Sequence, residues 1–113
     1  MRVLTLTALA CWLTASGALA ADGQQLFERQ CKVCHAGSAM GPSLKGVAGA
    51  KIASRAGYSY SPGLKARAGK WTPANLHAYL AAPSKFAPGT RMMLGVASAQ
   101  DRAALIEYLK TLK

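Results

Sequence analysis

Three stretches of the chain repeat apolar residues at helical spacing. The first runs from Asp22 to Cys34, and Asp22 together with Gln25 fits the capping box that begins many helices. One face of this stretch holds Gly23, Phe27, Cys31 and Cys34. The pattern therefore predicts an N-terminal helix over residues 22–34 with both cysteines on the same face.

The other two stretches lie in the second half of the chain and also begin with capping residues. Thr72 is placed as an N-cap with Pro73 as the first helical residue, and this helix has to end before Pro83. Ser98 and Asp101 form another capping pair at the start of the last helix. The apolar stripes of the two helices are Leu76, Tyr79 and Leu80, and Leu105, Tyr108, Leu109 and Leu112. These signals predict two further helices.

Residues 41–70, between the first two helices, show no strand alternation and are rich in Gly, Ser, Ala and Lys. A loop of that length in a compact domain needs an object to wrap around. No repeat and no second domain is visible. The chain is therefore expected to be all-α, with three main helices and long loops.

The N-terminus has the three parts of a secretory signal peptide. Arg2 gives a positive start, residues 3–13 an apolar core, and Ala18–Ala20 a cleavage site of the A-x-A type. The stretch is too short and too weakly apolar for a membrane-spanning helix. Cys11 could be a lipoprotein acylation site, but the residues before it match a lipobox poorly, so we place it in the discarded signal. Cleavage near Ala20 or Ala21 would export the protein, which in a bacterium means the periplasm.

The division into a signal peptide, residues 1–20, and one domain, residues 21–113, leaves a domain of marginal size for a hydrophobic core. Without Arg2 the chain keeps 13 basic and 4 acidic residues, or a net charge of +9. Such a balance suits a well-solvated monomer, or docking to acidic protein faces. Nucleic acid is a poor candidate because no basic–aromatic module accompanies the charge.

The chemistry of the domain centres on Cys31-Lys32-Val33-Cys34-His35. C-x-x-C-H is the attachment signature of c-type haem. Thiols three residues apart on a helical turn face the same way, so both can form thioethers with one porphyrin while His35 ligates its iron. A thioredoxin-like redox pair, half of a zinc site and a structural disulfide are the alternatives. No second C-x-x-C and no H-x-x-H follows to complete a zinc site.

A second iron ligand has four candidates in the domain: His77, Met40, Met92 and Met93. His77 has polar or small neighbours and is better explained as a surface residue. Met40 follows His35 too closely to cross easily to the other face of a haem. Met92 lies in an irregular segment between two helices, and its alternative role is to fill a gap in the core.

The chain resembles the class I c-type cytochromes, close in pattern to mitochondrial cytochrome c and its bacterial relatives. The resemblance covers the whole domain and rests on these segments: Gly23 with Phe27, Cys31–His35, Gly41–Leu44, Gly57–Ser61, Trp71, Tyr79-Leu80, Pro83 with Lys85, Pro88–Met92, and Leu105–Lys110. It implies the small class I fold wrapped around one covalent haem c.

By this resemblance His35 and Met92 are the iron ligands, with Met93 a non-ligating neighbour. It also implies that the Pro42 carbonyl accepts the free ring N–H of His35, and that Tyr79 donates to the Met92 sulfur. The resemblance implies that Tyr60, Trp71 and Thr90 hydrogen-bond the haem propionates, and that Leu44, Leu80 and Leu94 line the haem pocket. The crossing of the first and last helices is implied at Gly23 and Phe27 against Leu105 and Tyr108.

The chain departs from the family pattern at several positions. The loop from Ala36 to Met40 is short. Ala50 stands where the family has an arginine near the propionates, with Lys51 and Arg55 as candidate substitutes. Leu64 replaces an asparagine, and Leu94 replaces an aromatic residue beside the distal methionine.

The function implied is soluble, one-electron transfer in the periplasm, without catalysis and without stable membrane insertion. The expected partners are a cytochrome bc-type complex or dehydrogenase on one side and a terminal oxidase or reductase on the other, met through acidic faces. A haem enzyme of the peroxidase kind and a gas-binding sensor are the alternatives, and both need Met92 to leave the iron. A third alternative, a dedicated subunit of a larger dehydrogenase, is closer to the function of an electron carrier than these two.

Overall fold

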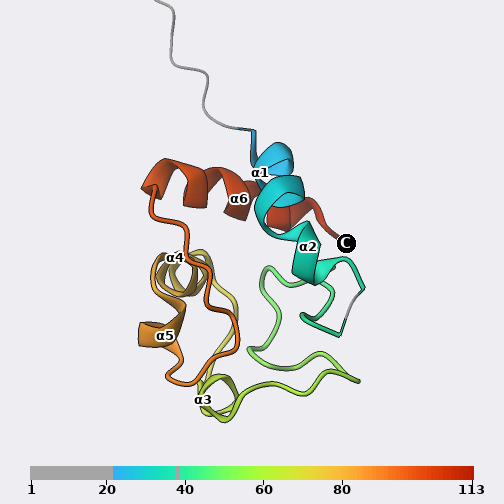
Figure 1. Ribbon diagram of the computed structural model, residues 1–113, viewed down its shortest axis with the longest axis vertical. Coiled ribbons are helices and arrows are strands. Elements are labelled where there is room, and N and C mark those ends of the chain that lie inside the picture. Colours follow the sequence, from blue (N-terminus) through green and yellow to red (C-terminus); the bar gives the residue numbers. More distant parts are fainter. Residues whose placement is uncertain (1–21, 38) are drawn as a thin grey trace, which may run out of the picture.

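The computed structural model describes residues 22–37 and 39–113 (Figure 1). The expected signal peptide lies outside the described residues. Within them the chain is helical, and its only ladder contact is an isolated antiparallel bridge between Lys51 and Lys70. The helices are α1 (Gly23–Gln30), α2 (Lys32–His35), α3 (Pro62–Lys65), α4 (Pro73–Ala81), α5 (Pro83–Phe86) and α6 (Ala99–Thr111). The expected all-α class is confirmed.

The three longer helices begin where their caps predict. The side chains of Asp22, Thr72 and Ser98 accept hydrogen bonds from backbone N–H groups two or three residues further on, at 3.0, 3.2 and 3.2 Å. Each bond satisfies a donor that has no partner inside its helix. The N-termini of α1, α4 and α6 are therefore fixed by local sequence.

The prediction of one continuous helix over residues 22–34 is wrong at Cys31. The chain leaves the helical ladder there, with φ −108° and ψ −41°, and resumes it as the single turn of α2. The Cys31 carbonyl accepts from the N–H groups of both Cys34 and His35, at 3.1 and 3.0 Å. The apolar spacing did not reveal this break because the helical twist continues almost unchanged through it.

The expectation of a loop without elements over residues 41–70 is also incomplete, because α3 lies within it. Ser61 caps this helix through a bond from Leu64 N to Ser61 Oγ at 3.3 Å, and Pro62 occupies its first turn. Pro83 ends α4, as predicted, but also begins α5. One-turn helices carry too few residues for a periodic signal, so only their caps and prolines could have predicted them.

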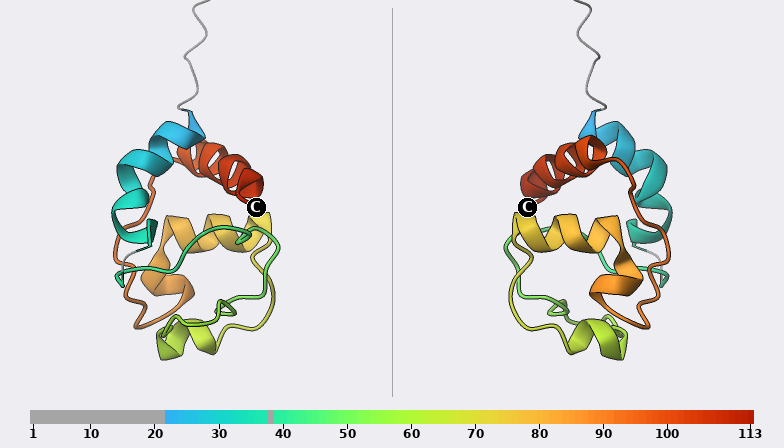
Figure 2. Two further views of the ribbon diagram at one scale, coloured as in Figure 1. Left: turned by 90° about the vertical axis from the view of Figure 1, so that its right-hand side faces the viewer. Right: turned by 90° about the vertical axis from the view of Figure 1, so that its left-hand side faces the viewer.

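Helices α1 and α6 cross at one end of the molecule, and α4 lies beneath them (Figure 2). The crossing point is Gly23, where any Cβ would run into the carbonyl of Ala104. Next to it the rings of Phe27 and Tyr108 pack at 5.2 Å with an angle of 56°. The expected crossing of first and last helices is thus present, and it closes the top of the fold.

The loops form the opposite side of the molecule and are tied to each other through the backbone. Gly49 N donates to Trp71 O at 2.9 Å, and Trp71 N donates to Ala50 O at 2.7 Å. Gly46 N reaches Leu112 O at 2.7 Å and so joins this side to the end of α6. These bonds tie the loops to one another and to the end of α6, around a central cavity.

Candidate functional site

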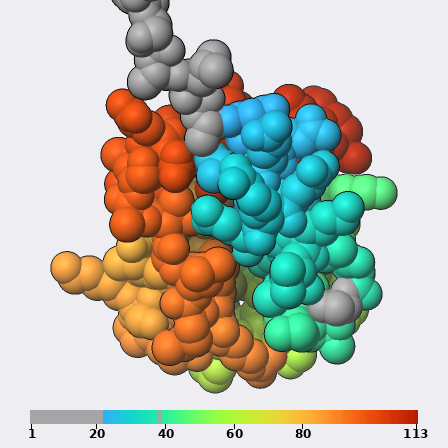
Figure 3. Space-filling model, turned by 45° about the horizontal axis from the view of Figure 1, so that its top comes forward, coloured from blue at the N-terminus to red at the C-terminus, as the bar shows by residue number. Residues whose placement is uncertain are grey.

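The central cavity has a volume of about 800 Å³ and opens between the loops and the helices. Figure 3 shows its mouth as a hollow between the cyan segment of α1 and α2 and the orange segment before α6. All twelve residues predicted for the site line it: Cys31, Cys34, His35, Pro42, Leu44, Tyr60, Trp71, Tyr79, Leu80, Thr90, Met92 and Leu94. Residues separated by sixty positions in the sequence thus meet around one space.

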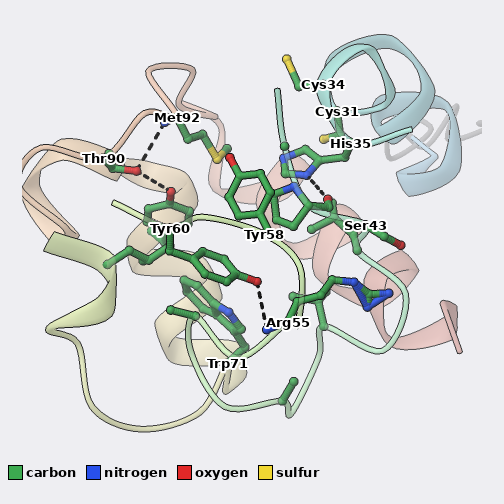
Figure 4. Close-up of a pocket in the computed structure, with 18 of the residues that line it drawn as sticks. Cys31, Cys34, His35, Ser43, Arg55, Tyr58, Tyr60, Trp71, Thr90 and Met92 are labelled. Carbon is green, nitrogen blue, oxygen red and sulfur yellow. Dashed lines mark hydrogen bonds between the residues drawn. The ribbon is translucent and has the colours of Figure 1, made fainter. Parts of the chain in front are cut away.

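The cysteines of the C-x-x-C-H motif lie beside His35 at the edge of the cavity (Figure 4). Burial, and secondarily the neighbouring Cys34 thiol, raises the pKa of the Cys31 thiol above its ordinary value of 9.0. Thioredoxin-like chemistry requires the opposite shift, toward a thiolate at neutral pH. The environment of Cys31 therefore disfavours the redox-pair alternative.

The structure also speaks against the other two alternatives for this motif. Across residues 22–37 and 39–113 no three His, Cys, Asp or Glu side chains gather as a metal site, so the zinc alternative has no further ligands. The part of the chain that the structure describes contains no disulfide between Cys31 and Cys34.

His35 is oriented by the loop that follows it. Its Nδ1 lies 2.7 Å from the Pro42 carbonyl oxygen. A carbonyl can only accept, so Nδ1 carries the proton and donates, which leaves the lone pair on Nε2 for a metal. Gly41 allows this approach, because a Cβ there would lie 3.0 Å from both Nδ1 and Cε1 of the His35 ring. The bond implied by the resemblance is present.

The opposite wall carries Met92. Figure 4 shows its side chain reaching into the cavity from the side that faces His35. Met92 is half-buried, whereas Met93 and Met40 are 78% and 68% exposed. His77, on α4, is not among the lining residues. Met40 and Met93 also line the cavity, so Met92 is set apart from them by the burial of its side chain.

Tyr79 and Thr90 support the Met92 wall through hydrogen bonds. The Tyr79 hydroxyl lies 2.8 Å from Thr90 Oγ1, and Met92 N donates to the same Oγ1 at 3.4 Å. The partner that the structure gives Tyr79 is therefore Thr90, where the resemblance implied the Met92 sulfur. An oxygen is a stronger hydrogen-bond partner than a thioether, which explains the preference. Burial raises the pKa of the Tyr79 phenol, although the Thr90 bond acts in the other direction.

The floor of the cavity combines aromatic rings with polar edges. Trp71 is buried and stacks on Phe86 with ring centroids 5.7 Å apart. The Tyr60 hydroxyl accepts from Arg55 N at 3.1 Å, which holds it at the end of the loop (Figure 4). Lys51 and Arg55, the candidate substitutes for the missing family arginine, both line the cavity, as does Ala50 itself.

Tyr58 and Arg91 are two of the lining residues that were not among the predicted site residues. Tyr58 packs edge-on against Tyr60 at 4.9 Å and donates its hydroxyl to Met40 O at 3.4 Å. Arg91 donates from its guanidinium to Ser59 O at 2.6 Å. Tyr58 and Tyr60 are two positions apart and so lie on one side of the segment, which could have predicted that Tyr58 lines the cavity. The bond of Arg91 joins residues 32 positions apart, and no local pattern predicts such a contact.

The residues of the cavity fit a haem. A volume of about 800 Å³ lies within the range of sites that enclose a cofactor-sized molecule. Leucines and aromatic rings suit a flat apolar macrocycle, and hydroxyl, indole and basic groups on the floor suit its carboxylates. The two thiols and the oriented His35 occupy the edge where covalent attachment takes place. Within the described residues no group of three His, Cys, Asp or Glu side chains competes for this space.

Comparison with known proteins agrees with this chemistry. The family Cytochrome c matches residues 20–113. The chain is 43% identical over 94 residues to "Cytochrome c-type cyt cy" of Rhodobacter capsulatus, a match that covers 80% of this chain and 47% of that protein. It is 42% identical over 94 residues to cytochrome c of Ginkgo biloba, covering 78% of this chain and 83% of the relative. The chain thus spans about half the length of the Rhodobacter relative but most of the plant one.

Among solved structures, cytochrome cH from Methylobacterium extorquens superimposes with a TM-score of 0.73 at 40% identity. The match covers 81% of this chain and 97% of that one. The chain belongs to the cytochrome c family of electron carriers and holds a covalent c-type haem through Cys31 and Cys34.

Proposed function

We propose that this chain is an exported one-electron carrier whose haem iron is held by His35 Nε2 on one side and by the Met92 sulfur on the other. The observation that carries the proposal is the placement of these two side chains on facing walls of one cavity. The haem supplies reversible one-electron chemistry when bound. What the protein adds is orientation, exclusion of water and control of charge.

His35 and Met92 perform different tasks in this arrangement. The Pro42 carbonyl fixes the tautomer and plane of the His35 ring and increases the basicity of Nε2. Met92 offers a soft, neutral sulfur, which favours the reduced state and raises the potential. If His35 and Met92 both bound the iron, they would leave oxygen or peroxide no position on it, so a peroxidase or gas sensor is the less favoured function.

The floor groups would hold the haem carboxylates. Tyr60, Trp71 and Thr90 offer two hydroxyls and an indole N–H, which reduce the cost of burying negative charge. Thr90 has a second task, since its Oγ1 also contacts Tyr79 and the Met92 backbone. One threonine therefore connects the carboxylate side of the site with the ligand segment.

Docking is proposed to use the basic surface around the cavity. All four acidic residues of the chain, Asp22, Glu28, Asp101 and Glu107, belong to α6 or to α1 and its cap. Residues 36–98 contain none, and the ion pair found among the described residues joins Lys110 to Glu107, both on α6. Arg29, Lys32, Lys45, Lys85 and Arg91 are the residues proposed for contact with an acidic partner.

The partners proposed are a cytochrome bc-type complex or dehydrogenase as donor and a terminal oxidase or reductase as acceptor. A shuttle has to release its partner quickly, so weak, charge-steered encounter suits it better than a large apolar interface. Electron transfer to such a partner should slow steeply as salt rises. A rate that is indifferent to ionic strength would remove the docking argument.

Export is the remaining part of the proposal. We propose that residues 1–20 are removed and that the domain works as a monomer in the periplasm. No helix within residues 22–37 and 39–113 has the length and hydropathy to cross a bilayer. Mass determination of the protein recovered from the periplasm, after haem attachment, tests the cleavage near Ala20 or Ala21.

The ligand assignment is tested with two neighbouring methionines. Met92→Ala should abolish the methionine–ferric charge-transfer band and allow the ferrous protein to bind carbon monoxide. Met93→Leu, the matched control, should change neither property because its side chain is exposed. Equal loss of the band in both variants would contradict the assignment. Immediate carbon monoxide binding by the unmutated protein would favour the enzyme or sensor function instead.

A further inference from the structure

The segment that carries Met92 has little backbone support of its own. Within the described chain, none of residues 92–95 takes part in a backbone–backbone hydrogen bond. Only Met92 N has a partner, the side chain of Thr90 at 3.4 Å. Met93 and Leu94 are 78% and 55% exposed, so packing holds them weakly as well. A segment of this kind opens easily unless it is held at its ends.

The first end is held by Arg91. Its guanidinium donates to the carbonyl of Ser59 at 2.6 Å. Ser59 belongs to the loop between Tyr58 and Tyr60, both of which line the cavity. The bond therefore joins two loops that are far apart in the sequence. It does so at the residue directly before Met92.

The second end is held by a backbone bond from Val96 N to Leu80 O at 2.7 Å and by the side chain of Arg102 of α6. One guanidinium nitrogen donates to two successive carbonyls, Val96 O at 2.7 Å and Ala97 O at 2.9 Å. The Nε of the same side chain is buried and has no hydrogen-bond partner among the described residues. Leaving a buried donor of a charged group unpaired costs free energy, and the two carbonyl bonds have to offset that cost. Arg102 is thus committed to this place in the fold.

We propose that Arg91 and Arg102 are positioning residues that together hold residues 92–95 so that the Met92 sulfur stays directed into the cavity. This inference rests on Met92 as an iron ligand, as proposed above. Arg91 attaches one end of the segment to the loop around Ser59, and Arg102 attaches the other end to helix α6. The two attachments limit how far residues 92–95 can move outward. Arginine suits the task because one planar fork keeps its charge and can serve two carbonyls at once.

The test uses the haem-loaded protein and imidazole as an exogenous ligand. Imidazole replaces Met92 only after the sulfur leaves the iron, so the substitution rate at saturating imidazole reports opening of the segment. Arg102→Met keeps much of the aliphatic stem, removes both carbonyl bonds, and should raise the rate roughly tenfold. Arg91→Gln should raise it less, roughly threefold, because Arg91 is exposed to solvent.

Thr111→Val is the matched control. Thr111 is exposed and donates its hydroxyl to the Tyr108 carbonyl at 2.6 Å, but this bond stays within α6. The control should keep the wild-type rate. If Arg102→Met does not fold or does not acquire haem, Arg102→Lys and Arg91→Gln carry the test, with Arg102→Lys expected between wild type and Arg102→Met.

Two results would overturn the inference while leaving Met92 ligation intact. One is a wild-type charge-transfer band together with Arg91 and Arg102 variants that exchange at the control rate. The other is an Arg102 variant whose denaturation midpoint falls while its imidazole rate stays at the wild-type value, which would make the residue merely structural. Absence of the band in the unmutated protein would instead overturn the ligand assignment itself.

Discussion

Gly41 is the position where a single methyl group would act most directly on His35. Its backbone is not in the left-handed region, so alanine meets no conformational strain there. An added Cβ would lie 2.9 Å from the Cys34 carbonyl oxygen and 3.0 Å from both Cε1 and Nδ1 of His35. Ordinary contacts of a Cβ begin at 3.4 Å, so three neighbours have to yield by a few tenths of an ångström.

The carbonyl is part of α2 and cannot yield easily, whereas the imidazole can rotate. We therefore expect Gly41→Ala to tilt the ring and lengthen the 2.7 Å bond from His35 Nδ1 to Pro42 O. Overpacking of this kind costs about 1–3 kcal/mol of folding stability. A neutral hydrogen bond is worth about 0.5–1.5 kcal/mol. A tenfold change in the equilibrium constant for reduction corresponds to about 59 mV for a one-electron couple. Complete loss of the hydrogen bond would therefore change the reduction potential by at most about 60 mV.

The sign follows from the role of the bond. Donation to Pro42 makes Nε2 more basic and stabilises the ferric state, so weakening it should raise the reduction potential. Potentiometric titration of Gly41→Ala beside wild type measures the shift, and denaturant unfolding measures the stability. Gly46→Ala is a useful comparison, because its added Cβ meets nothing within 4 Å although its φ of +70° adds backbone strain. A potential that is unchanged or lower in Gly41→Ala, while stability falls, would refute the link between the Pro42 bond and the iron.

Three further outcomes are expected. Gly23→Ala should lower the free energy of unfolding by about 3 kcal/mol, because the methyl would meet the Ala104 carbonyl of α6, whereas the exposed neighbour Gln24→Ala should be almost neutral in denaturant titrations. Ala53→Gly should raise the free energy of unfolding by about 0.5–1 kcal/mol in the same assay. Ala53 is held at φ 56°, and glycine removes that strain, which outweighs the greater conformational entropy that glycine gives the unfolded chain. Burial raises the pKa of Tyr79 above 10.0, so below pH 10 the contribution of Tyr79 to the free energy of unfolding is constant. Above pH 10 the phenol ionises more readily in the unfolded chain than in the folded one, and stability falls as pH rises. Tyr79→Phe should flatten this alkaline decline, and an equal slope in both proteins would contradict the burial argument.

The elements that local sequence could predict are those with a cap and at least two turns. The caps Thr72 and Ser98 and the stop at Pro83 fixed α4 and α6 to within a residue or two. The break at Cys31 escaped prediction because it changes the hydrogen-bond pattern without interrupting the apolar spacing. Helix α3 escaped because a single turn has no period, although Ser61 and Pro62 form a recognisable start.

The site divides in a similar way. The attachment motif is local, so Cys31, Cys34 and His35 were evident from spacing alone. Met92 needed the resemblance to separate a ligand from a methionine that fills a gap in the core. The contacts that support these residues join distant segments, such as Thr90 with Tyr79 and Arg102 with Val96. Such contacts depend on how loops are folded back on helices, and no periodicity or short motif encodes that.

The crossing of α1 with α6 also bears on how the protein is made. The partner of the first helix is the last one, so Gly23 and Phe27 find their packing surface only after residues 99–111 have been synthesised. Contacts between the two ends of a chain form late, since the whole intervening loop has to close first. Before the two ends meet, the thiols of Cys31 and Cys34 stay accessible, so we expect haem attachment to precede the closing of the fold by α6.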